Sequence, residues 1–420
     1  MRVLIVNTSE RTGGAAVAAS RLAEALMNNG IKAKLLVRDK QSRAPHVVSA
    51  GGGLRGKWCF LYERVVIWLN NLFSRRHLFA VSIANTGTDI TLLPEFQEAD
   101  VVHLHWVNQG FLSRSAIGKV LSSGKPVVWT MHDMWPLTAI CHHAYECDGY
   151  RRSCGRCPFL RFPGDNDLSA RVFRRKQRLL AAAAGRPIAF VAVSEWLAGK
   201  ARESALTGTF PVHVIPNAIS LSHFTRIDRT DARTALGVSE RVVLSFGAAR
   251  IDDPIKGFHY LADALRLLVD SGRLQRSDVR VLLFGGVRDG GVLSQLPVPY
   301  THLGYIDDED RLSLIYSASD ATVSSSLYET FGQTLIEAMA CGSVPVSFAG
   351  SGQADIISHR QNGYLADRLS VESLADGIMW AVSSGLKPQD QRRSVSRRYA
   401  ESVVARRYTD LYQQLLNENH

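Results

Sequence analysis

Hydrophobic positions in the first half of the chain alternate between short continuous runs and stretches with helical spacing. Continuous apolar runs of this length are typical of strands that are buried on both sides. Strands of this kind that alternate with helices favour a parallel sheet with helices on both faces. The pattern predicts strands over 3–6, 33–37, 101–105, 127–130 and 188–193, and a first helix over 15–27.

A second series of the same kind occupies the second half. Residues 228–239 are polar with helical spacing, and a new apolar strand begins at residue 241. Another apolar run, 281–284, leads into a glycine pair, and helical patterns close the chain, the last of them over about 391–416. A length of 420 residues is enough for two or three domains. We therefore expect an α/β protein with two parallel-sheet domains.

Composition excludes several classes of protein. The chain is 46% hydrophobic and 21% charged, as in ordinary globular proteins. No uninterrupted apolar run reaches the length that spans a bilayer. The first eight residues are too short and polar-ended for a signal peptide and instead predict a strand. We expect a cytoplasmic protein whose six cysteines are reduced.

Net charge changes this picture by indicating anionic partners. The formal charge is +10, and basic residues mix with aromatic residues over 55–62 and 73–79, with a further basic run over 171–178. Such segments can adsorb to an anionic membrane surface, or their aromatics can be core while the basic residues cover a helix. Both interpretations stay open. The residues concerned are Trp58, Phe60, Trp68, Phe73 and Phe79, among Arg55, Lys57, Arg64, Arg75 and Arg76.

Two carboxylates in the last third of the chain are candidates for a ligand-binding site. The run 321–323 predicts a strand, and a helix is predicted to follow near residue 335, with Glu329 in the loop and Glu337 inside the helix. Phe331-Gly332 lies where the helix N-terminus offers unpaired amides to a phosphate. A phosphate there would leave Glu337 able to reach a ribose and Glu329 a sugar. Either glutamate alone would more often lie on the surface of an amphipathic helix.

This arrangement closely resembles the E-x7-E signature of retaining glycosyltransferases of the family 4 type, which have the GT-B fold; the larger family includes glycogen and sucrose synthases. The resemblance covers nearly the whole chain. It implies two facing Rossmann-like domains, an acceptor-binding domain over 1–212 and a nucleotide-sugar-binding domain over 213–397. It also implies a C-terminal helix over 398–420 that returns to the first domain.

A basic pair follows the strand that begins at residue 241. Arg250 and Lys256 at the carboxyl edge of the sheet would neutralise a diphosphate, although both could be solvated surface charges. The resembled family has this pair, usually one residue closer together. The resemblance also implies that the segment with Tyr305 and Ile306 contacts the nucleotide base. We expect this basic pair to replace the divalent metal that other glycosyltransferases use, and so expect catalysis without a metal cofactor.

The first domain contributes further candidates. Gly13-Gly14 follows the first strand and would open a helix N-terminus to an anion in the donor, although a plain tight turn is equally consistent. His132 ends the strand over 127–130, where the resembled family has a histidine near the transferred sugar. The predicted catalytic residues are thus His132, Arg250, Lys256 and Glu329.

Four cysteines crowd into the segment 141–158. Their spacing in a reduced protein predicts a structural zinc with four thiolates, and unligated cysteines are the alternative. The segment also resembles an insert in bacterial exopolysaccharide glycosyltransferases of the colanic-acid type. The predicted ligands are Cys141, Cys147, Cys154 and Cys157, with His142 and His143 as substitutes.

The resemblance implies transfer of a sugar from a UDP or GDP donor, with retention at the anomeric carbon. The implied acceptor is a glycan, carried on a polyprenyl diphosphate in exopolysaccharide or O-antigen synthesis, which suggests peripheral attachment to the inner face of the cytoplasmic membrane. Two alternatives remain: a PLP-dependent phosphorylase of the same fold, and a non-catalytic zinc-containing protein that binds nucleic acid. We expect no nucleic-acid partner.

Overall fold

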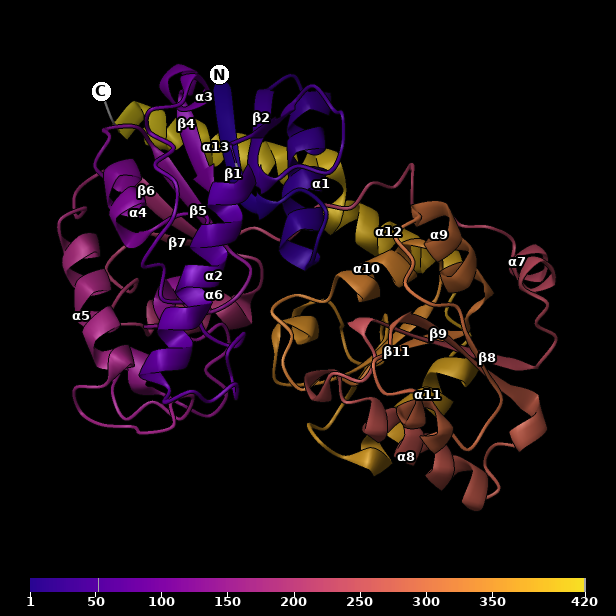
Figure 1. Ribbon diagram of the computed structural model, residues 1–420. Helices are drawn as coiled ribbons and strands as arrows, with labels where there is room; N and C mark the ends of the chain where they lie inside the picture. Colours follow the sequence, from indigo (N-terminus) through magenta and orange to yellow (C-terminus); the bar gives the residue numbers. More distant parts are fainter. Residues whose placement is uncertain (52, 419–420) are drawn as a thin grey trace. The chain divides into compact units, whose positions relative to one another are not determined.

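The computed structural model describes residues 1–51 and 53–418, and the chain forms two compact units (Figure 1). Unit 1 comprises Met1–Ala218 and Val404–His420, and unit 2 comprises Ile219–Val403. The first boundary lies six residues beyond the predicted one at 212, and the second lies six residues beyond the predicted one at 397.

Unit 1 is built on a seven-stranded parallel sheet with the order β3-β2-β1-β4-β5-β6-β7. The central strands β4, β5 and β6 are buried along their whole length, as their continuous apolar runs predicted. The strands are β1 (Arg2–Ser9), β2 (Lys32–Asp39), β3 (Val47–Ser49), β4 (Val101–Leu104), β5 (Val127–Met131), β6 (Ile188–Ala192) and β7 (Val212–Val214).

Helices cover this sheet, and the last helix of the chain is one of them. Tyr408 and Tyr412 of α13 are buried and hydrogen-bond to Thr130 and His103 on β5 and β4, which fixes the C-terminal helix on unit 1. The helices of this unit are α1 (Gly14–Asn28), α2 (Gly53–Asn70), α3 (Pro94–Glu98), α4 (Arg114–Leu121), α5 (Leu168–Ala181), α6 (Glu195–Arg202) and α13 (Glu401–Glu418).

Unit 2 repeats the plan with a six-stranded parallel sheet of order β10-β9-β8-β11-β12-β13. Its strands are β8 (Val242–Arg250), β9 (Val279–Gly286), β10 (Tyr300–His302), β11 (Ala321–Ser324), β12 (Val344–Phe348) and β13 (Tyr364–Ala366). Its helices are α7 (Arg229–Leu236), α8 (Phe258–Asp270), α9 (Glu309–Ala318), α10 (Gln333–Ala340), α11 (Val371–Ser383) and α12 (Pro388–Tyr399).

The single helix predicted over about 391–416 is wrong. The structure has two helices there, α12 and α13, separated at Ala400. Ala400 is extended, with ψ at 146°, and forms a β-bridge with Ile219. The backbone N–H of Ile219 donates to the carbonyl of Tyr399 at 2.9 Å. This pairing across the sequence takes the backbone out of the helical conformation, so α12 belongs to unit 2 and most of α13 to unit 1.

The prediction of two parallel-sheet, Rossmann-like α/β domains is confirmed. In each sheet, one pair of neighbouring strands marks the point where the strand order reverses: β1 and β4 in unit 1, β8 and β11 in unit 2. Ligands of such folds bind beyond the carboxyl ends of these strands. Within the described residues, no helix combines the length and apolar character needed to cross a bilayer.

Candidate active site

An ion pair lies at the carboxyl edge of β8 and β11 in unit 2. Lys256 Nζ is 2.8 Å from Glu329 Oε2. The lysine ends a 3₁₀ turn, Pro254–Lys256, and the glutamate lies in the loop between β11 and α10. Burial alone would lower the pKa of Lys256, but the carboxylates of Glu329 and Asp253 outweigh it, so this pKa lies above its usual value. The ammonium therefore stays charged at neutral pH.

Gly257 makes this pairing possible. Its φ is +63°, and a Cβ there would lie 2.1 Å from the carbonyl oxygen of Ser325. Only glycine allows the chain to pass so close to the end of β11. The Ser325 hydroxyl also donates to the Gly257 carbonyl at 2.8 Å. The close approach holds Lys256 beside the loop that carries Glu329.

Arg250 is the last residue of β8, at the start of the loop between β8 and α8 that also carries Lys256. Its Nε is 3.3 Å from Asp252 Oδ1, and its Nη2 is 3.5 Å from Asp253 Oδ2. These are ion pairs, and Nε has no hydrogen-bond partner among the residues that the structure describes. A guanidinium with an unused buried donor is suited to a diphosphate, which it can bind through two parallel hydrogen bonds.

Helix α10 begins at the same edge. Gly332 precedes it with φ at +112° and no side chain caps its N-terminus. Glu337 is buried on this helix, and its carboxylate accepts a hydrogen bond of 3.0 Å from the Tyr316 hydroxyl. Phe331 is also buried, with its ring against Tyr399, so a donor would meet its backbone rather than its ring.

The segment after β10 carries the residues predicted to contact the base. The N–H of Gly285, at the end of β9, donates to the carbonyl of Gly304 at 2.7 Å and ties this segment to the sheet. Tyr305 is exposed and Ile306 is half-buried. The predicted unit 2 residues thus lie at the end of β8, in the loops after the strands, or, for Glu337, within α10.

The other predicted residues belong to unit 1. Gly13, with φ at +91°, precedes α1, and a Cβ on it would meet no atom within 4 Å in the described structure. Gly14 is the first residue of α1, and a Cβ on it would also meet no described atom within 4 Å. His132 directly follows β5.

Sequence reasoning missed two histidines beside His132. Nδ1 of His105 and Nε2 of His132 share a hydrogen bond of 2.8 Å, and their rings are stacked. His103 shares hydrogen bonds of 2.7 Å with Thr130 and with Tyr412 of α13. One signal in the sequence could have identified them: the two histidines are two residues apart at the end of β4, the strand that pairs with β5, and so point to the same face of the sheet. This row of side chains links the predicted catalytic histidine to the C-terminal helix.

Burial determines the charge of these imidazoles. It lowers the pKa of His132 to about 4 and moves the pKa values of His103 and His105 well below the usual value. His132 is therefore neutral at pH 7. The neighbouring Asp133 accepts a hydrogen bond of 2.7 Å from the Trp106 indole and pairs with His142 at 2.6 Å.

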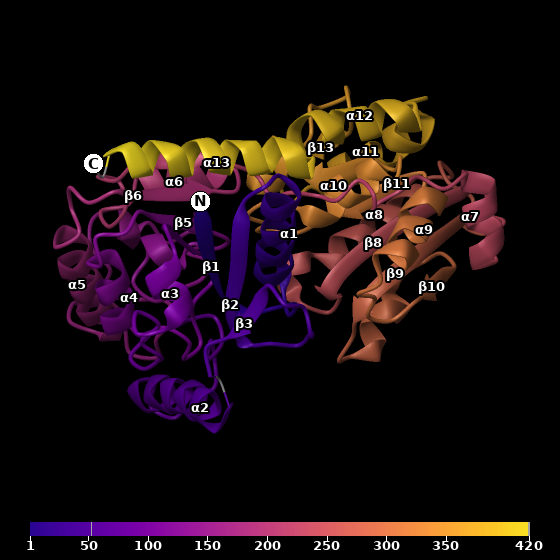
Figure 2. The ribbon, with the colours of Figure 1, turned by 90° about the horizontal axis from the view of Figure 1, so that it is seen from above.

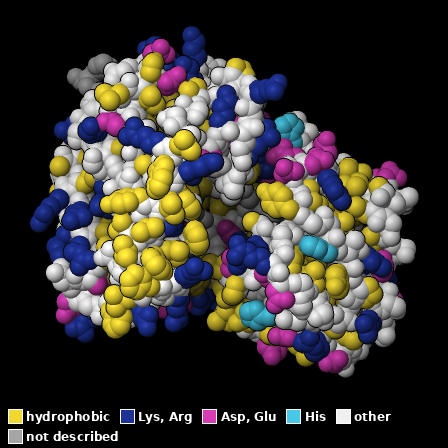
Figure 3. Space-filling view, viewed as in Figure 1, with side chains coloured by type: hydrophobic (Ala, Val, Ile, Leu, Met, Phe, Trp, Pro, Cys, Tyr) yellow, Lys and Arg dark blue, Asp and Glu magenta, His cyan; other side chains and the backbone are white. Residues whose placement is uncertain are grey.

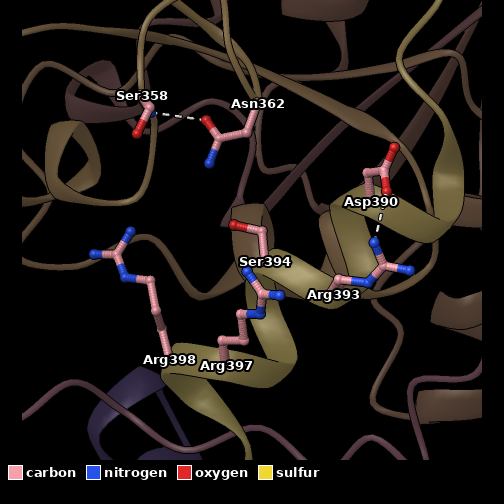
Figure 4. Close-up of a pocket in the computed structure, with 7 residues that line it drawn as sticks. All are labelled: Ser358, Asn362, Asp390, Arg393, Ser394, Arg397 and Arg398. Atoms are coloured by element: carbon pink, nitrogen blue, oxygen red, sulfur yellow. Dashed lines mark hydrogen bonds and ion pairs between the residues drawn. The ribbon is translucent and has the colours of Figure 1, made fainter.

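A separate pocket of about 430 Å³ lies in unit 2 (Figure 4). Arg393 pairs there with Asp390 at 3.4 Å, and the N–H of Ser358 donates to Asn362 at 2.7 Å. None of the predicted site residues lines it. It is lined by Ser358, Asn362, Asp390, Arg393, Ser394, Arg397 and Arg398.

The four cysteines of the 141–158 segment are free thiols. Burial raises the pKa of Cys154 to about 12 and that of Cys157 to about 11, and it also raises the pKa of Cys141. Within the described part of the chain, however, no group of three or more His, Cys, Asp or Glu residues is placed to hold a metal ion. This arrangement does not fit the predicted zinc.

Elemental analysis decides whether zinc is bound. The predicted site would hold about one zinc per chain, because four thiolates complete a tetrahedral structural site. Cys154→Ser would then destabilise unit 1, since metal binding contributes to folding. The free Cys341 in unit 2, changed to serine, is the matched control for zinc content. Protein purified without chelator that contains no zinc would remove the prediction.

Comparison with protein families matches both halves of the chain. Residues 12–223 match the family described as Glycosyltransferase Family 4, and residues 228–399 match Glycosyl transferases group 1. The two matches together cover every strand of the two sheets except β1.

Curated relatives are similar to this chain over part of it or over nearly all of it. The chain is 31% identical over 192 residues to the D-inositol 3-phosphate glycosyltransferase of Actinosynnema mirum, covering 41% of this chain and 46% of that protein. It is 29% identical over 209 residues to the phosphatidyl-myo-inositol mannosyltransferase of Mycobacterium tuberculosis, covering 47% and 53%. The chain thus spans about half the length of these relatives. A match of 24% identity to the D-inositol 3-phosphate glycosyltransferase of Jonesia denitrificans covers 93% and 88%.

Solved structures match over the whole chain. Sucrose-phosphate synthase from Thermosynechococcus elongatus superposes with a TM-score of 0.68 at 18% identity, covering 99% of both chains. Anabaena HepE in complex with UDP and glucose superposes with a TM-score of 0.64 at 16% identity, covering 99% of this chain and 100% of that one. At these identities the likeness shows the fold, which confirms the predicted GT-B class.

Proposed function

Because this chain belongs to glycosyltransferase family 4, we propose that it transfers a sugar from a UDP or GDP donor to a glycan acceptor, with retention at the anomeric carbon. The observation that supports this most is the Lys256–Glu329 ion pair, with Arg250 in the same connection and the open N-terminus of α10 at the same edge. These groups together provide positive charge for a diphosphate and a carboxylate for a sugar hydroxyl.

In the proposed reaction the bond between the anomeric carbon and the diphosphate oxygen breaks while the acceptor hydroxyl attacks from the same face. The proton of that hydroxyl passes to the departing phosphate oxygen. Negative charge grows on the diphosphate as the bond breaks. Arg250, Lys256 and the amides of α10 stabilise this charge more strongly than that of the bound donor, which lowers the barrier. They take the place of a divalent metal.

Glu337 has a different proposed role, in binding the nucleotide ribose. Glu337→Gln is expected to weaken nucleotide binding about 10- to 100-fold, as the loss of a charged hydrogen-bond acceptor typically does, with little change in kcat. Isothermal titration with UDP and GDP measures this. Tyr316→Phe removes the hydroxyl that donates to Glu337 and keeps the carboxylate, so it serves as the control. Unchanged nucleotide affinity in Glu337→Gln would contradict the role.

For the acceptor we propose a glycan carried on a polyprenyl diphosphate, used in exopolysaccharide or O-antigen synthesis at the inner face of the cytoplasmic membrane. One relative, the phosphatidyl-myo-inositol mannosyltransferase of Mycobacterium tuberculosis, is named for a lipid acceptor. The basic, aromatic segments of unit 1 also support a peripheral attachment.

A panel of sugar nucleotides tests the proposed donor. Thermal unfolding of the purified protein is followed with UDP- and GDP-sugars, in buffer with EDTA. One nucleotide class should raise the melting temperature, because a ligand that binds only the folded state stabilises it. No stabilisation by any sugar nucleotide would count against the proposal. An absorption band of a bound pyridoxal cofactor would favour the phosphorylase alternative instead.

A further inference from the structure

Helix α2 exposes an apolar face. Figure 2 shows this helix at the margin of unit 1, set apart from the sheet. Leu54 is 77% exposed and Trp58 is 68% exposed, and further apolar residues follow at helical spacing on the same side. These six residues are Leu54, Trp58, Leu61, Tyr62, Val65 and Leu69, and we refer to them as the α2 face.

The inward side of α2 buries Gly56, Cys59 and Ile67 together with two charged residues. Glu63 and Arg64 are both buried there and form an ion pair of 3.0 Å. Glu63 accepts hydrogen bonds from the backbone N–H groups of Ile83 and Ala84, at 2.7 and 2.8 Å. A surface helix ordinarily buries its apolar stripe and exposes its charges. On α2 an apolar stripe is exposed while two charged residues are buried, which indicates that the α2 face has a partner outside unit 1.

The apolar surface continues beyond the helix. Leu72, Phe73 and Phe79 are exposed, and so is Phe162 in the loop before α5. The N–H of Arg161 donates to Asn71 Oδ1 at 2.5 Å, which places that loop beside the end of α2. Figure 3 shows hydrophobic side chains gathered over this region, with Lys and Arg side chains around them. Contiguous apolar surfaces of this kind mark interaction sites.

The backbone at the end of α2 is held in a costly conformation. Leu72 and Phe73 have φ values of +46° and +60°, which bulky residues rarely adopt. The Trp68 indole donates to the carbonyl of Phe73 at 2.6 Å, and the N–H of Phe73 donates to the carbonyl of Trp68 at 2.8 Å. These bonds keep an exposed phenylalanine in a strained position, as is common at functional sites.

Over residues 53–82 the exposed charge of this surface is of one sign. Between residues 53 and 82 the sequence contains one acidic residue, Glu63, and that residue is buried against Arg64. Exposed basic residues surround the apolar ones: Arg55, Lys57, Arg75, Arg76, Arg161 and Arg171. The sequence interpretation is corrected in part, because Arg64 is buried and Phe60 and Trp68 are half-buried, whereas Trp58, Phe73 and Phe79 are exposed as the membrane hypothesis requires.

We propose that the α2 face, with Leu72, Phe73, Phe79 and Phe162, is a docking surface for an anionic lipid bilayer. The aliphatic side chains favour hydrocarbon over nucleic acid, which stacks on aromatic rings. The positive charge over residues 53–82 favours an anionic surface over a second copy of the same face. An interfacial helix of this kind lies in the headgroup region, with its apolar face toward the acyl chains and its basic residues on anionic headgroups. The inference rests on the proposed lipid-linked acceptor and identifies the surface that reaches it.

Co-sedimentation with vesicles tests the docking surface. The protein should partition onto vesicles of phosphatidylcholine with phosphatidylglycerol, and less onto phosphatidylcholine alone or at high salt. The double variant Trp58→Gln/Leu61→Gln should lose about tenfold or more in partitioning, because each side chain contributes by leaving water. Both side chains point to solvent, so circular dichroism should show an unchanged fold.

Leu92→Gln is the matched control. Leu92 is 79% exposed, as Leu54 is at 77%, but it lies two residues before α3, and α3 is apart from α2 in both ribbon views (Figures 1 and 2). This variant should partition as the unchanged protein does. A second pair, Arg75→Gln/Arg76→Gln, should weaken binding to the anionic vesicles and leave the small binding to neutral ones unchanged. Absence of the unchanged protein from anionic vesicles at low salt would overturn the proposal, and so would equal partitioning of the α2 and Leu92 variants.

Two further measurements separate this inference from the proposed function. Nucleotide affinity should be the same for the α2 variants and the unchanged protein, because unit 2 is not altered. If the protein binds sugar nucleotides but no vesicles, the docking surface is disproved and the proposed sugar transfer is not affected. A concentration-dependent dimer that Trp58→Gln/Leu61→Gln abolishes, without vesicle binding, would show that a second copy covers the face.

Discussion

Lys256→Ala is expected to lower kcat/KM about 100- to 1000-fold, as removal of a preorganised charge at a transition state typically does. The ammonium is held by Glu329 at 2.8 Å and remains charged, so it meets the developing diphosphate charge without rearrangement. Steady-state kinetics with the donor identified by thermal unfolding measure the effect. The loss should appear largely in kcat, because the contact strengthens in the transition state.

Lys387→Ala is the control for this variant. Lys387 is the other lysine of unit 2 and is exposed, so its loss should leave kcat/KM unchanged. Glu329→Gln should also lower kcat, with the nucleotide still bound. Because the two residues act as a pair, the double variant should lose less than the product of the single losses. Near-normal kcat/KM in Lys256→Ala would contradict the assignment of this site.

Arg64→Ala is expected to lower the free energy of unfolding of unit 1 by about 3–5 kcal/mol, because it leaves the Glu63 carboxylate buried without its partner. The guanidinium also donates to the carbonyls of Leu78 and Val81, at 2.5 and 3.0 Å. Urea unfolding followed by tryptophan fluorescence measures the change. Six of the seven tryptophans lie in unit 1, so this signal reports on that unit.

Arg55→Ala on the same helix is the matched control, because Arg55 is exposed and should contribute less than about 0.5 kcal/mol. The double variant Glu63→Gln/Arg64→Met removes both charges and should recover part of the loss. Arg64→Ala with the stability of the unchanged protein would show that the pair does not hold α2 on unit 1.

The strands were predictable because their signal is local. A parallel strand that is buried on both faces is a continuous apolar run, and β4, β5 and β6 are such runs. The carboxyl ends of parallel strands lie at one edge of the sheet, so the residues that follow each strand are predicted to lie at that edge. The sequence therefore predicted Lys256 and Glu329 at one edge, although they are 73 positions apart.

Features that depend on contacts between distant segments could not be predicted in the same way. The bridge between Ala400 and Ile219 breaks the last helix, and nothing in the residues around Ala400 indicates it. The histidine row beside His132 depends on the register between β4 and β5. Glu63 and Arg64 look like ordinary surface charges until the loop carrying Ile83 and Ala84 is placed against α2. For the same reason, the exposed side of α2 could not be identified from the sequence.

The anomeric configuration of the product tests the central claim most directly. The unchanged protein and Lys256→Ala are incubated with the cognate sugar nucleotide and an acceptor, in EDTA, and the product is examined by proton NMR. The proposed mechanism predicts that the donor's configuration is retained and that the variant forms product about 100- to 1000-fold more slowly. An inverted product, or equal rates for the two proteins, would contradict it.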